Sequence, residues 1–256
     1  MEHEKIVILS DLDGTFLDRE SKTVERNMKA IEDFKAKGGH FSFASGRVPP
    51  MMRKTYPGFD SQINSPAILC NGGCLYDPES RTYLYEHRMD GAFCAGVLKE
   101  MKENFDIPYY VVYTGNEYQI NENADIDKID GIEWNKFCIG GKNPDSTEEM
   151  KKYLDKKYGD RFNMIRSNAR FLEIVDKCVA KGNMLPVIKD YYKKKGLDVT
   201  ICCIGDYEND LDMLKKADES FCPANSFDLV KKIAKHTVCS NNDGAIADLI
   251  EFMLAK

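Results

Sequence analysis

The chain has 256 residues, of which 43% are hydrophobic and 30% charged, and its formal net charge is −6. This length allows one large domain or two smaller ones with substantial cores, and the composition excludes extensive disorder. The negative balance creates no overall field that would attract nucleic acid or anionic lipid. An anionic ligand would therefore need a local positive site.

Neither the ends of the chain nor its cysteines indicate a secreted or membrane protein. No apolar run reaches the length of a membrane span, and the acidic residues 1–5 lead directly into an apolar run, so we expect no signal peptide. Of the nine cysteines, Cys70 and Cys74 lie close together, but no second pair or histidine cluster completes a zinc pattern. We expect a cytoplasmic protein with reduced thiols, and neither a structural zinc nor a catalytic cysteine.

The stretch from residue 6 to residue 15 is the most informative in the chain. A short apolar run, residues 6–9, is followed by Asp11 and Asp13 and then by Gly14. Such a run is typical of a strand buried on both faces of a parallel sheet, and ligands bind just beyond the carboxyl ends of such strands. Two carboxylates this close repel each other unless a cation lies between them. We therefore expect a metal site at this strand end.

The following residues continue an alternation of helices and strands. We expect a helix that begins near Thr23, its N-cap, and ends at Gly38-Gly39, with apolar residues on one face. A second buried strand is expected at 41–44, before Ser45-Gly-Arg47, and Pro49-Pro50 suits the first turn of a helix. The apolar positions of the helix expected after Thr23 are Val24, Met28, Ile31 and Phe34.

A third apolar run, residues 67–70, precedes Asn71-Gly-Gly73 and is expected to be another strand of the same sheet. Strands and helices in alternation indicate an α/β fold with a doubly wound, Rossmann-like parallel sheet. The Asn-Gly-Gly turn is either part of a ligand site or simply a tight turn.

The pattern changes in the middle of the chain, where tyrosine- and valine-rich runs predict antiparallel strands. We expect a hairpin at 74–88, helices at 92–104 and 146–158, a hairpin of strands 109–113 and 118–120 with its turn at 114–116, and strands at 134–140, 162–167 and 171–175. The sequence thus predicts an α+β insertion at 86–177 between two parts of the α/β core, 1–85 and 178–256.

From residue 181 the α/β pattern resumes. We expect a helix at 182–195, a buried strand at 199–204 that ends in Gly205-Asp-Tyr-Glu-Asn-Asp210, and short strands at 219–222 and 236–239, each followed by a helix. Asp206 and Asp210 are four residues apart, which is as typical of a charged helix face as of a ligand pair.

Polar residues thus cluster at four strand ends or helix starts: Asp11 with Asp13, Ser45, Lys181, and Asp206 with Asp210. Any one cluster is weak, because capping acids and serines are common there. Together they supply what phosphoryl transfer needs: a nucleophile, groups that hold a cation, donors for the phosphoryl oxygens and an acid for the leaving group.

In these four motifs the chain resembles the haloacid dehalogenase superfamily, and in particular the Cof-type phosphatases, whose large cap is inserted between the second and third motifs. The motifs are Asp11-Leu-Asp-Gly-Thr15, Ser45-Gly-Arg47, Lys181-Gly182 and Gly205-Asp-Tyr-Glu-Asn-Asp210. The resemblance implies a phosphatase with a Rossmann-like core and an α+β cap. One turn departs from the family pattern: Pro223-Ala-Asn225 stands where a Gly-Asn-Ala-like turn is usual.

The resemblance also implies a role for each motif residue. Asp11 would be the nucleophile and a ligand of Mg²⁺. Asp13 would bind the metal through its backbone carbonyl and act as acid and base through its side chain. Asp206 would complete the metal ligands, and Asp210 would lie in the second shell. The phosphoryl group would be held by the Leu12 and Gly46 amides, the Ser45 hydroxyl, Lys181 and Asn209.

The expected substrate is a small phosphorylated metabolite such as a sugar phosphate, and the expected protein is a monomer or homodimer that binds neither nucleic acid nor a membrane. Two alternatives stay open: a phosphomutase or phosphotransferase with the same chemistry, and a non-catalytic protein that binds a phosphorylated metabolite. The presence of the second acid, Asp13, favours phosphate esters over the dehalogenase and phosphonatase chemistry of the superfamily. The sequence does not identify the substrate.

Overall fold

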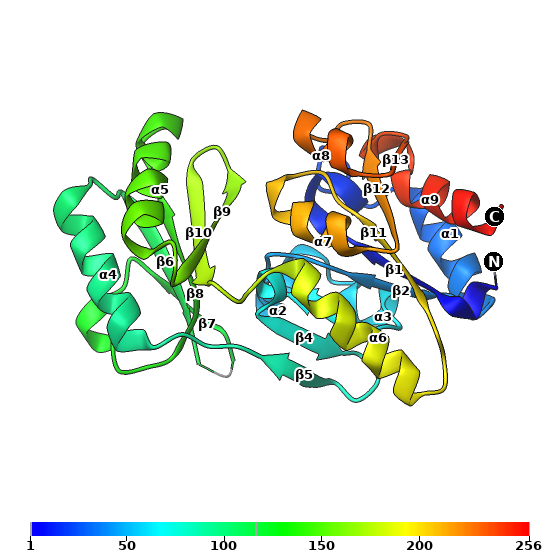
Figure 1. The fold of residues 1–256 in the computed structure, drawn as a ribbon, viewed down its shortest axis with the longest axis horizontal. Coiled ribbons are helices and arrows are strands. Elements are labelled where there is room, and N and C mark those ends of the chain that lie inside the picture. Colours follow the sequence, from blue (N-terminus) through cyan, green and yellow to red (C-terminus); the bar gives the residue numbers. More distant parts are fainter. Residues whose placement is uncertain (1, 116, 256) are drawn as a thin grey trace. The chain divides into compact units, whose positions relative to one another are not determined.

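The computed structural model describes residues 2–115 and 117–255, and the chain forms two compact units (Figure 1). The first, called the core unit, contains Met1–Arg47, Met51–Tyr85 and Ala180–Lys256. The second, called the inserted unit, contains Val48–Pro50 and Glu86–Val179. Each unit is described by itself.

The core unit is built on a five-stranded sheet in which neighbouring strands are parallel, in the order β13-β12-β11-β1-β2. Its strands are β1 (Ile6–Ser10), β2 (His40–Phe43), β11 (Thr200–Ile204), β12 (Glu219–Pro223) and β13 (His236–Val238). β1 is buried along its whole length, as expected of a central strand covered on both faces. The predicted α/β fold with a parallel sheet is confirmed.

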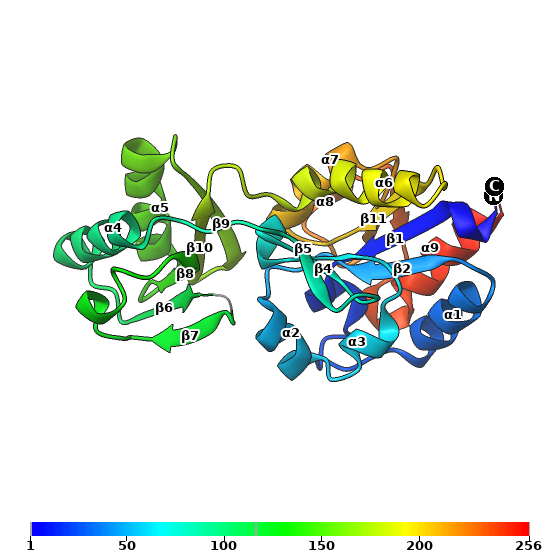
Figure 2. The same ribbon diagram turned by 90° about the horizontal axis from the view of Figure 1, so that it is seen from below.

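Helices cover both faces of this sheet (Figure 2). One face carries α6 (Leu185–Lys194), α7 (Leu211–Lys216) and α8 (Asp228–Ile233), whose apolar side chains pack on β1, β11 and β12. The other face carries α1 (Glu25–Ala36) and α9 (Ala245–Leu254), which contact each other. This two-sided cover explains why the strands appear in the sequence as continuous apolar runs.

The remaining core strands form a second, smaller sheet, so the prediction for residues 67–70 is partly wrong. β3 (Ala67–Leu69) pairs antiparallel with β4 (Cys74–Asp77), and β5 (Thr82–Glu86) completes this three-stranded sheet. β3 joins the edge of the parallel sheet through a single bridge between Ala44 and Ile68. A tight turn between two strands favours hairpin pairing, so β3 pairs along its length with β4. On its other edge, the Ile68 carbonyl accepts the Ser45 amide at 2.8 Å and the Cys70 amide donates to the Arg47 carbonyl at 3.0 Å.

Two predicted helix starts differ by a few residues from the structure. Thr23 forms a bridge with Leu17, and Val24 is the N-cap of α1, which begins at Glu25. The helix expected from residue 182 begins with a 3₁₀ turn, Lys181–Met184, and α6 starts at Leu185. Pro186, in the first turn of α6, has no amide hydrogen and fits an α-helix there. The proline-led helix α2 (Pro49–Thr55) is confirmed, and α3 (Phe59–Gln62) follows it.

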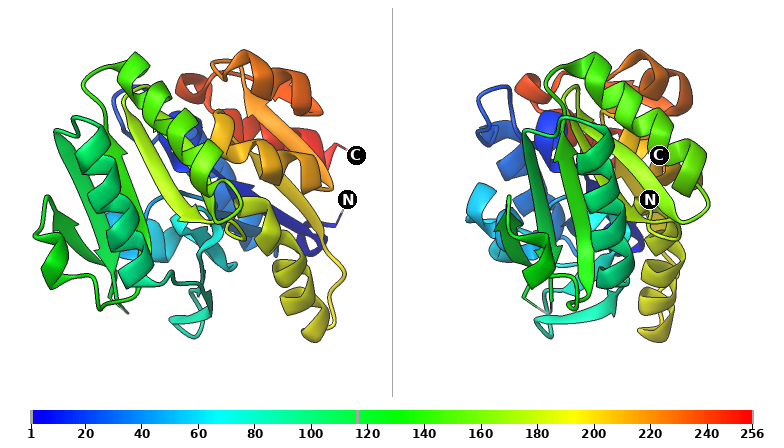
Figure 3. Two further views of the ribbon diagram at one scale, coloured as in Figure 1. Left: turned by 60° about the vertical axis from the view of Figure 1, so that its left-hand side comes forward. Right: turned by 90° about the vertical axis from the view of Figure 1, so that its left-hand side faces the viewer.

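The inserted unit is a five-stranded antiparallel sheet in the order β7-β6-β8-β10-β9 with two helices on one face (Figure 3). The elements are α4 (Gly91–Asn104), β6 (Tyr109–Thr114), β7 (Gln119–Glu122), β8 (Trp134–Gly140), α5 (Pro144–Tyr158), β9 (Phe162–Asn168) and β10 (Phe171–Asp176). The antiparallel strands predicted here are confirmed. The turn predicted at 114–116 includes Asn116, which lies outside the described residues.

The apolar side chains of the inserted unit form their own core between its sheet and helices. Trp134 and Phe137 of β8 are completely buried there against α4 and α5. None of the helices in the described part of the chain is long and apolar enough to cross a membrane. None of the nine cysteines, all of which are described, forms a disulfide bond.

Candidate active site

The register of the parallel sheet aligns the carboxyl ends of β1, β2 and β11, and three of the four sequence motifs follow these ends. Ser10, the last residue of β1, lies opposite Ile204 of β11 and Phe43 of β2. The backbone continues this alignment past the strand ends, since the Asp11 amide donates to the Ile204 carbonyl at 2.9 Å. Asp11 is therefore next to the loop that contains Asp206, as expected for residues that follow neighbouring parallel strands.

Lys181 lies beside Asp11, just beyond the carboxyl end of β1. Its side chain is fully buried, and its Nζ lies 2.8 Å from Asp11 Oδ1 and 2.7 Å from Asp210 Oδ1. The other Asp210 oxygen accepts the amides of Asp206 and Tyr207 at 3.0 and 3.2 Å. Asp210 therefore fixes both the lysine and the backbone of the loop. A buried lysine is stable only with such partners, because an unpaired charge in the interior is costly.

Asp206 completes an acidic group around Lys181. Thr15 donates its hydroxyl to Asp206 Oδ1 at 2.8 Å. The carboxylate also lies against Gly14, whose φ is +77° and where a Cβ would be 2.5 Å from Asp206 Oδ2. Only glycine fits this position, because its backbone is left-handed and it has no side chain. One oxygen each of Asp11, Asp206 and Asp210 lie within 4.8 Å of one another.

The electrostatics of this acidic group are unfavourable in the metal-free protein. Burial raises the pKa of Asp11 well above its usual range, and the charges of Asp210 and Asp206 raise it further, against the lowering effect of Lys181. Burial, with the charge of Asp210, raises the pKa of Asp206 to about 7. Burial lowers the pKa of Lys181, but Asp11 and Asp210 outweigh it and the net shift is upward. The group therefore has more negative charge than its one lysine balances.

A divalent cation fits this environment. Three carboxylates and one lysine carry a formal net charge of −2, and an all-oxygen donor set is the one that Mg²⁺ prefers. The raised pKa values are what close carboxylates show without a cation between them. Asp210 is one of the three carboxylates that lie close enough to share an ion. Both of its oxygens already accept hydrogen bonds, from Lys181 and from the amides of Asp206 and Tyr207.

The second acid of the first motif points to a different partner. Both oxygens of Asp13 accept hydrogen bonds from Arg47, from Nε and Nη2, each at 2.9 Å. The side chain of Asp13 is half exposed. Arg47 belongs to the second motif, but its role was missed by sequence reasoning. The only signal was that it directly follows Ser45-Gly46.

The remaining predicted residues lie around these acids. Ser45 is buried, and its hydroxyl accepts the Arg47 amide at 3.2 Å, while its carbonyl accepts the Asn71 amide at 3.1 Å. The turn that begins at Asn71 therefore borders Ser45. Leu12 and Gly46 follow β1 and β2, and Asn209 lies half-buried in the 3₁₀ turn before α7.

Two asparagines hold the loop that contains Asp13. Asn225 Nδ2 donates to the Gly14 carbonyl at 2.8 Å, and Asn225 Oδ1 accepts the Asn241 amide at 2.9 Å. Asn241 in turn donates to the Leu17 carbonyl at 2.8 Å. The departure from the family turn at 223–225 therefore leaves an asparagine in contact with the first motif. A hollow of about 250 Å³ is lined by Asp13, Gly14, Leu17, Asp18, Arg19, Ser21, Asn225 and Asn241.

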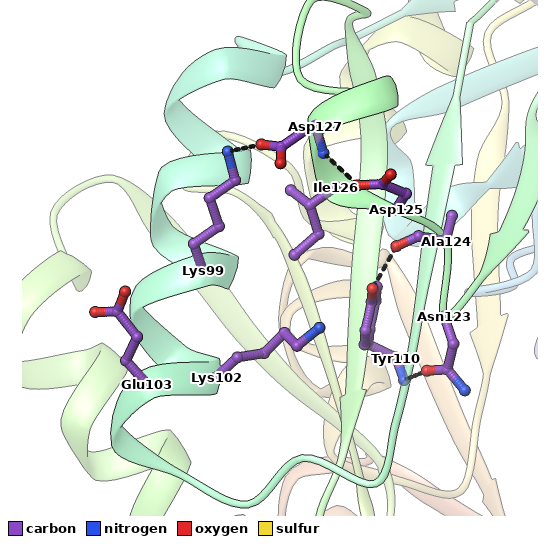
Figure 4. A pocket seen from close by; sticks show the side chains of 9 residues that line it. All are labelled: Lys99, Lys102, Glu103, Tyr110, Asn123, Ala124, Asp125, Ile126 and Asp127. Atoms are coloured by element: carbon purple, nitrogen blue, oxygen red, sulfur yellow. Dashed lines mark hydrogen bonds and ion pairs between the residues drawn. The ribbon is translucent and has the colours of Figure 1, made fainter.

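A separate hollow of about 550 Å³ lies wholly within the inserted unit, between α4 and residues 123–127 (Figure 4). Its polar groups largely pair with each other: Lys99 with Asp127, the Tyr110 hydroxyl with the Ala124 carbonyl, and the Tyr110 amide with Asn123 Oδ1 at 2.8 Å. Lys102 lies over the Tyr110 ring, 4.8 Å from its centroid. Its acids are Glu103, Asp125 and Asp127, of which Asp127 pairs with Lys99, and its lining includes no residue of the four sequence motifs.

Comparison with known proteins identifies the family. The model of the haloacid dehalogenase-like hydrolases matches residues 8–250. A Streptococcus pyogenes protein that is provisionally named a phosphatase is 27% identical, over 95% of this chain and 96% of its own. The 5-amino-6-(5-phospho-D-ribitylamino)uracil phosphatase YbjI of Escherichia coli is 26% identical, over 97% of this chain and 96% of its own.

A solved structure agrees with this result. A haloacid dehalogenase-like hydrolase from Bacillus subtilis has a TM-score of 0.79 at 19% identity, over 96% of this chain and 99% of its own. The resemblance and the enzyme class expected from the four motifs are thereby confirmed. The chain belongs to the haloacid dehalogenase-like hydrolase family.

Proposed function

We propose that this protein is a Mg²⁺-dependent phosphatase that hydrolyses small phosphorylated metabolites, above all sugar phosphates, through an aspartyl-phosphate on Asp11. The observation that carries the proposal is the group around Lys181, in which one buried lysine contacts Asp11 and Asp210, and Asp206 lies beside these two acids. A purely structural ion pair needs no excess of carboxylates. The excess of negative charge is explained if a divalent cation binds there, and that cation would also attract a phosphate dianion during catalysis.

The first step is attack by Asp11 on phosphorus. A bond forms between a carboxylate oxygen of Asp11 and the phosphorus, and the bond from phosphorus to the leaving oxygen breaks. Asp13, in its protonated form, gives that oxygen its proton, so the alcohol leaves neutral. Lys181 fixes one oxygen of Asp11 at 2.8 Å, which orients the carboxylate for attack. Mg²⁺ would be held by Asp11, Asp206 and the Asp13 carbonyl and would neutralise charge on the phosphoryl group.

The second step is hydrolysis. Asp13, now a carboxylate, removes a proton from water, the water oxygen attacks phosphorus, and phosphate leaves Asp11 unmodified. Donors for the phosphoryl oxygens would be Ser45, the amides of Leu12 and Gly46, Lys181 and Asn209. Arg47 donates one hydrogen bond to each Asp13 oxygen, which orients this carboxylate and leaves a second lone pair on each oxygen for proton transfer.

We further propose that the inserted unit, residues 86–177, acts as the cap that selects the leaving group and excludes water from the reaction. YbjI, at 26% identity, is named for activity on a phosphorylated ribitylamino-uracil, in which the phosphate sits on a sugar-alcohol chain. The YitU protein of Bacillus subtilis, 23% identical over 98% of both chains, is named for the same substrate. Phosphorylated sugars and sugar alcohols are therefore the first compounds to test.

The proposal is tested by phosphate release from p-nitrophenyl phosphate and a panel of sugar phosphates with Mg²⁺. We expect turnover that chelator abolishes, and a loss of at least about a thousandfold in Asp11→Asn, since the amide is a poor nucleophile. Asp33→Asn, an exposed acid on α1, is the matched control and should retain full activity.

A wild-type rate in Asp11→Asn would exclude the covalent mechanism. An isomerised sugar phosphate in place of free phosphate would identify a mutase. Tight binding without phosphate release across the panel would identify a binding protein.

A further inference from the structure

A second cluster of metal-ligand side chains lies outside the active site, at the base of the inserted unit. It consists of His87, Asp176 and Cys178, each of which offers one ligand atom within 4.8 Å of the others. His87 Nε2 lies 3.3 Å from Asp176 Oδ2, and Cys178 Sγ lies 3.7 Å from each ring nitrogen of His87. His87 and Asp176 are half-buried, and Cys178 is exposed.

The separation of the histidine and aspartate atoms matches a tetrahedral metal centre. With Zn–N or Zn–O near 2.0–2.1 Å, tetrahedral angles place nitrogen and oxygen about 3.3 Å apart. Nε2 and Oδ2 are 3.3 Å apart in the protein, and the Cys178 amide, which donates to Asp176 Oδ1 at 3.0 Å, orients the carboxylate with Oδ2 toward His87. Cys178 Sγ is 3.7 Å from both ring nitrogens, so it lies near the ring but not beside the Nε2 lone pair. The Cys178 side chain, which is exposed, or the imidazole ring must therefore rotate for one ion to contact all three ligands.

The donor types select the kind of metal. A thiolate, an imidazole and a carboxylate suit Zn²⁺, whereas Mg²⁺ prefers oxygen ligands alone. The cluster therefore differs in chemistry from the all-oxygen group around Lys181. Three protein ligands leave a fourth tetrahedral position for water.

We propose that His87, Asp176 and Cys178 form a zinc site that links the two connecting segments of the inserted unit. His87 lies on the segment that follows β5, and Asp176 and Cys178 lie on the segment that ends β10. A bound ion joins these segments at the point where the inserted unit leaves and returns to the core unit, and so restricts their relative motion. The sequence offered no signal for this site, because its ligands come from distant parts of the chain.

Cobalt binding to the full-length, metal-free protein tests the proposal, because Co²⁺ bound to a thiolate has a sulfur-to-metal charge-transfer band in the near ultraviolet. We expect this band at one equivalent of Co²⁺, in the presence of excess Mg²⁺, and its loss when Zn²⁺ is added. Cys178→Ser and His87→Gln should abolish the band and weaken Zn²⁺ binding at least about a hundredfold, since even second-shell losses cost about 10–100-fold.

Two controls separate this site from the others. Cys138→Ser removes another partly exposed thiol of the inserted unit, and Asp206→Asn removes a carboxylate of the active site. Both variants should retain the cobalt band. Absence of the band in the wild type, or its survival in Cys178→Ser or His87→Gln, would overturn the proposal. Neither result depends on whether the protein hydrolyses phosphate esters.

Discussion

Each unit of this protein contains a buried lysine, and the two lysines have different surroundings. In the core unit, Lys181 lies against Asp11 and Asp210, with Asp206 beside them. In the inserted unit, Lys136 of β8 forms an ion pair with Glu173 of β10 at 2.7 Å, and its ammonium lies 4.9 Å from the centroid of the Tyr113 ring. The first group carries one positive and three negative charges. The Lys136–Glu173 pair is balanced.

This difference separates a reactive group from a structural one. A balanced pair between adjacent strands can be replaced by apolar side chains at little cost, because the attraction between the charges roughly offsets their desolvation. An excess of buried carboxylates destabilises the protein and raises their pKa values until a cation binds. Such a cost is typical of sites kept for function. Three substitutions test this comparison.

The largest effect on stability is expected from Lys181→Met. The variant leaves Asp11 and Asp210 buried without their cation, so we expect a loss of about 3–5 kcal/mol in the free energy of unfolding, measured with denaturant in the absence of Mg²⁺. Lys189→Met on α6 is the control, because its pair with Asp218 is more exposed and should contribute less than about 1 kcal/mol. Equal losses in Lys181→Met and Lys189→Met would show that the buried lysine contributes no more to stability than the exposed one.

Asp206→Asn should instead increase the free energy of unfolding of the metal-free protein above pH 7. The pKa of Asp206 is raised to about 7, so the folded state holds a proton that the unfolded state has lost between about pH 4 and pH 7. Stability of the metal-free wild type therefore falls as pH rises through this window. At pH 8 we expect the variant to be more stable by about 1–3 kcal/mol, a difference that disappears near pH 4.

The measurement is denaturant unfolding at both pH values, with chelator and then with Mg²⁺. Mg²⁺ should stabilise the wild type and have much less effect on Asp206→Asn. A variant that is less stable than the wild type at pH 8 without metal would contradict the view that these carboxylates repel each other.

The smallest net effect is expected in the inserted unit. Lys136→Met alone removes the ammonium 2.7 Å from Glu173 and should cost about 3 kcal/mol, whereas the double variant Lys136→Met/Glu173→Leu should lie within about 1 kcal/mol of the wild type. A double-mutant cycle of unfolding free energies checks this. A double variant as unstable as Lys136→Met would show that the pair does more than balance its own charges.

Local patterns in the sequence predicted most elements. Three of the four motifs follow strands of the parallel sheet, and the fourth, at Lys181, lies in the 3₁₀ turn before α6. The apolar runs of β1 and β11 are short, continuous and bounded by polar residues, so the burial of these strands could be predicted from the sequence. The family resemblance then distinguished Asp11 from Asp13, which residue spacing alone could not do.

The errors share a different cause: they depend on pairing between segments. The run at 67–70 has the composition of a parallel strand, yet β3 pairs mainly with β4. Thr23 is a good N-cap by type, but it pairs with Leu17 and the N-cap of α1 is Val24. The Arg47–Asp13 pair and the hydrogen bond from Asn225 to Gly14 likewise join residues far apart in the chain. No local period or propensity contains this information.

The strand order has a consequence for how this chain folds as it is synthesised. β1, near the N-terminus, pairs with β11 through Ile6 and Thr200, so this pairing cannot form until about four-fifths of the chain has been made, and the sheet is complete only when β13 has followed. The inserted unit, by contrast, draws its whole sheet from one continuous segment. We expect it to fold first and to leave β1, β2 and their apolar side chains waiting for their partners, which makes the first 85 residues the part most exposed to aggregation or chaperone binding during synthesis.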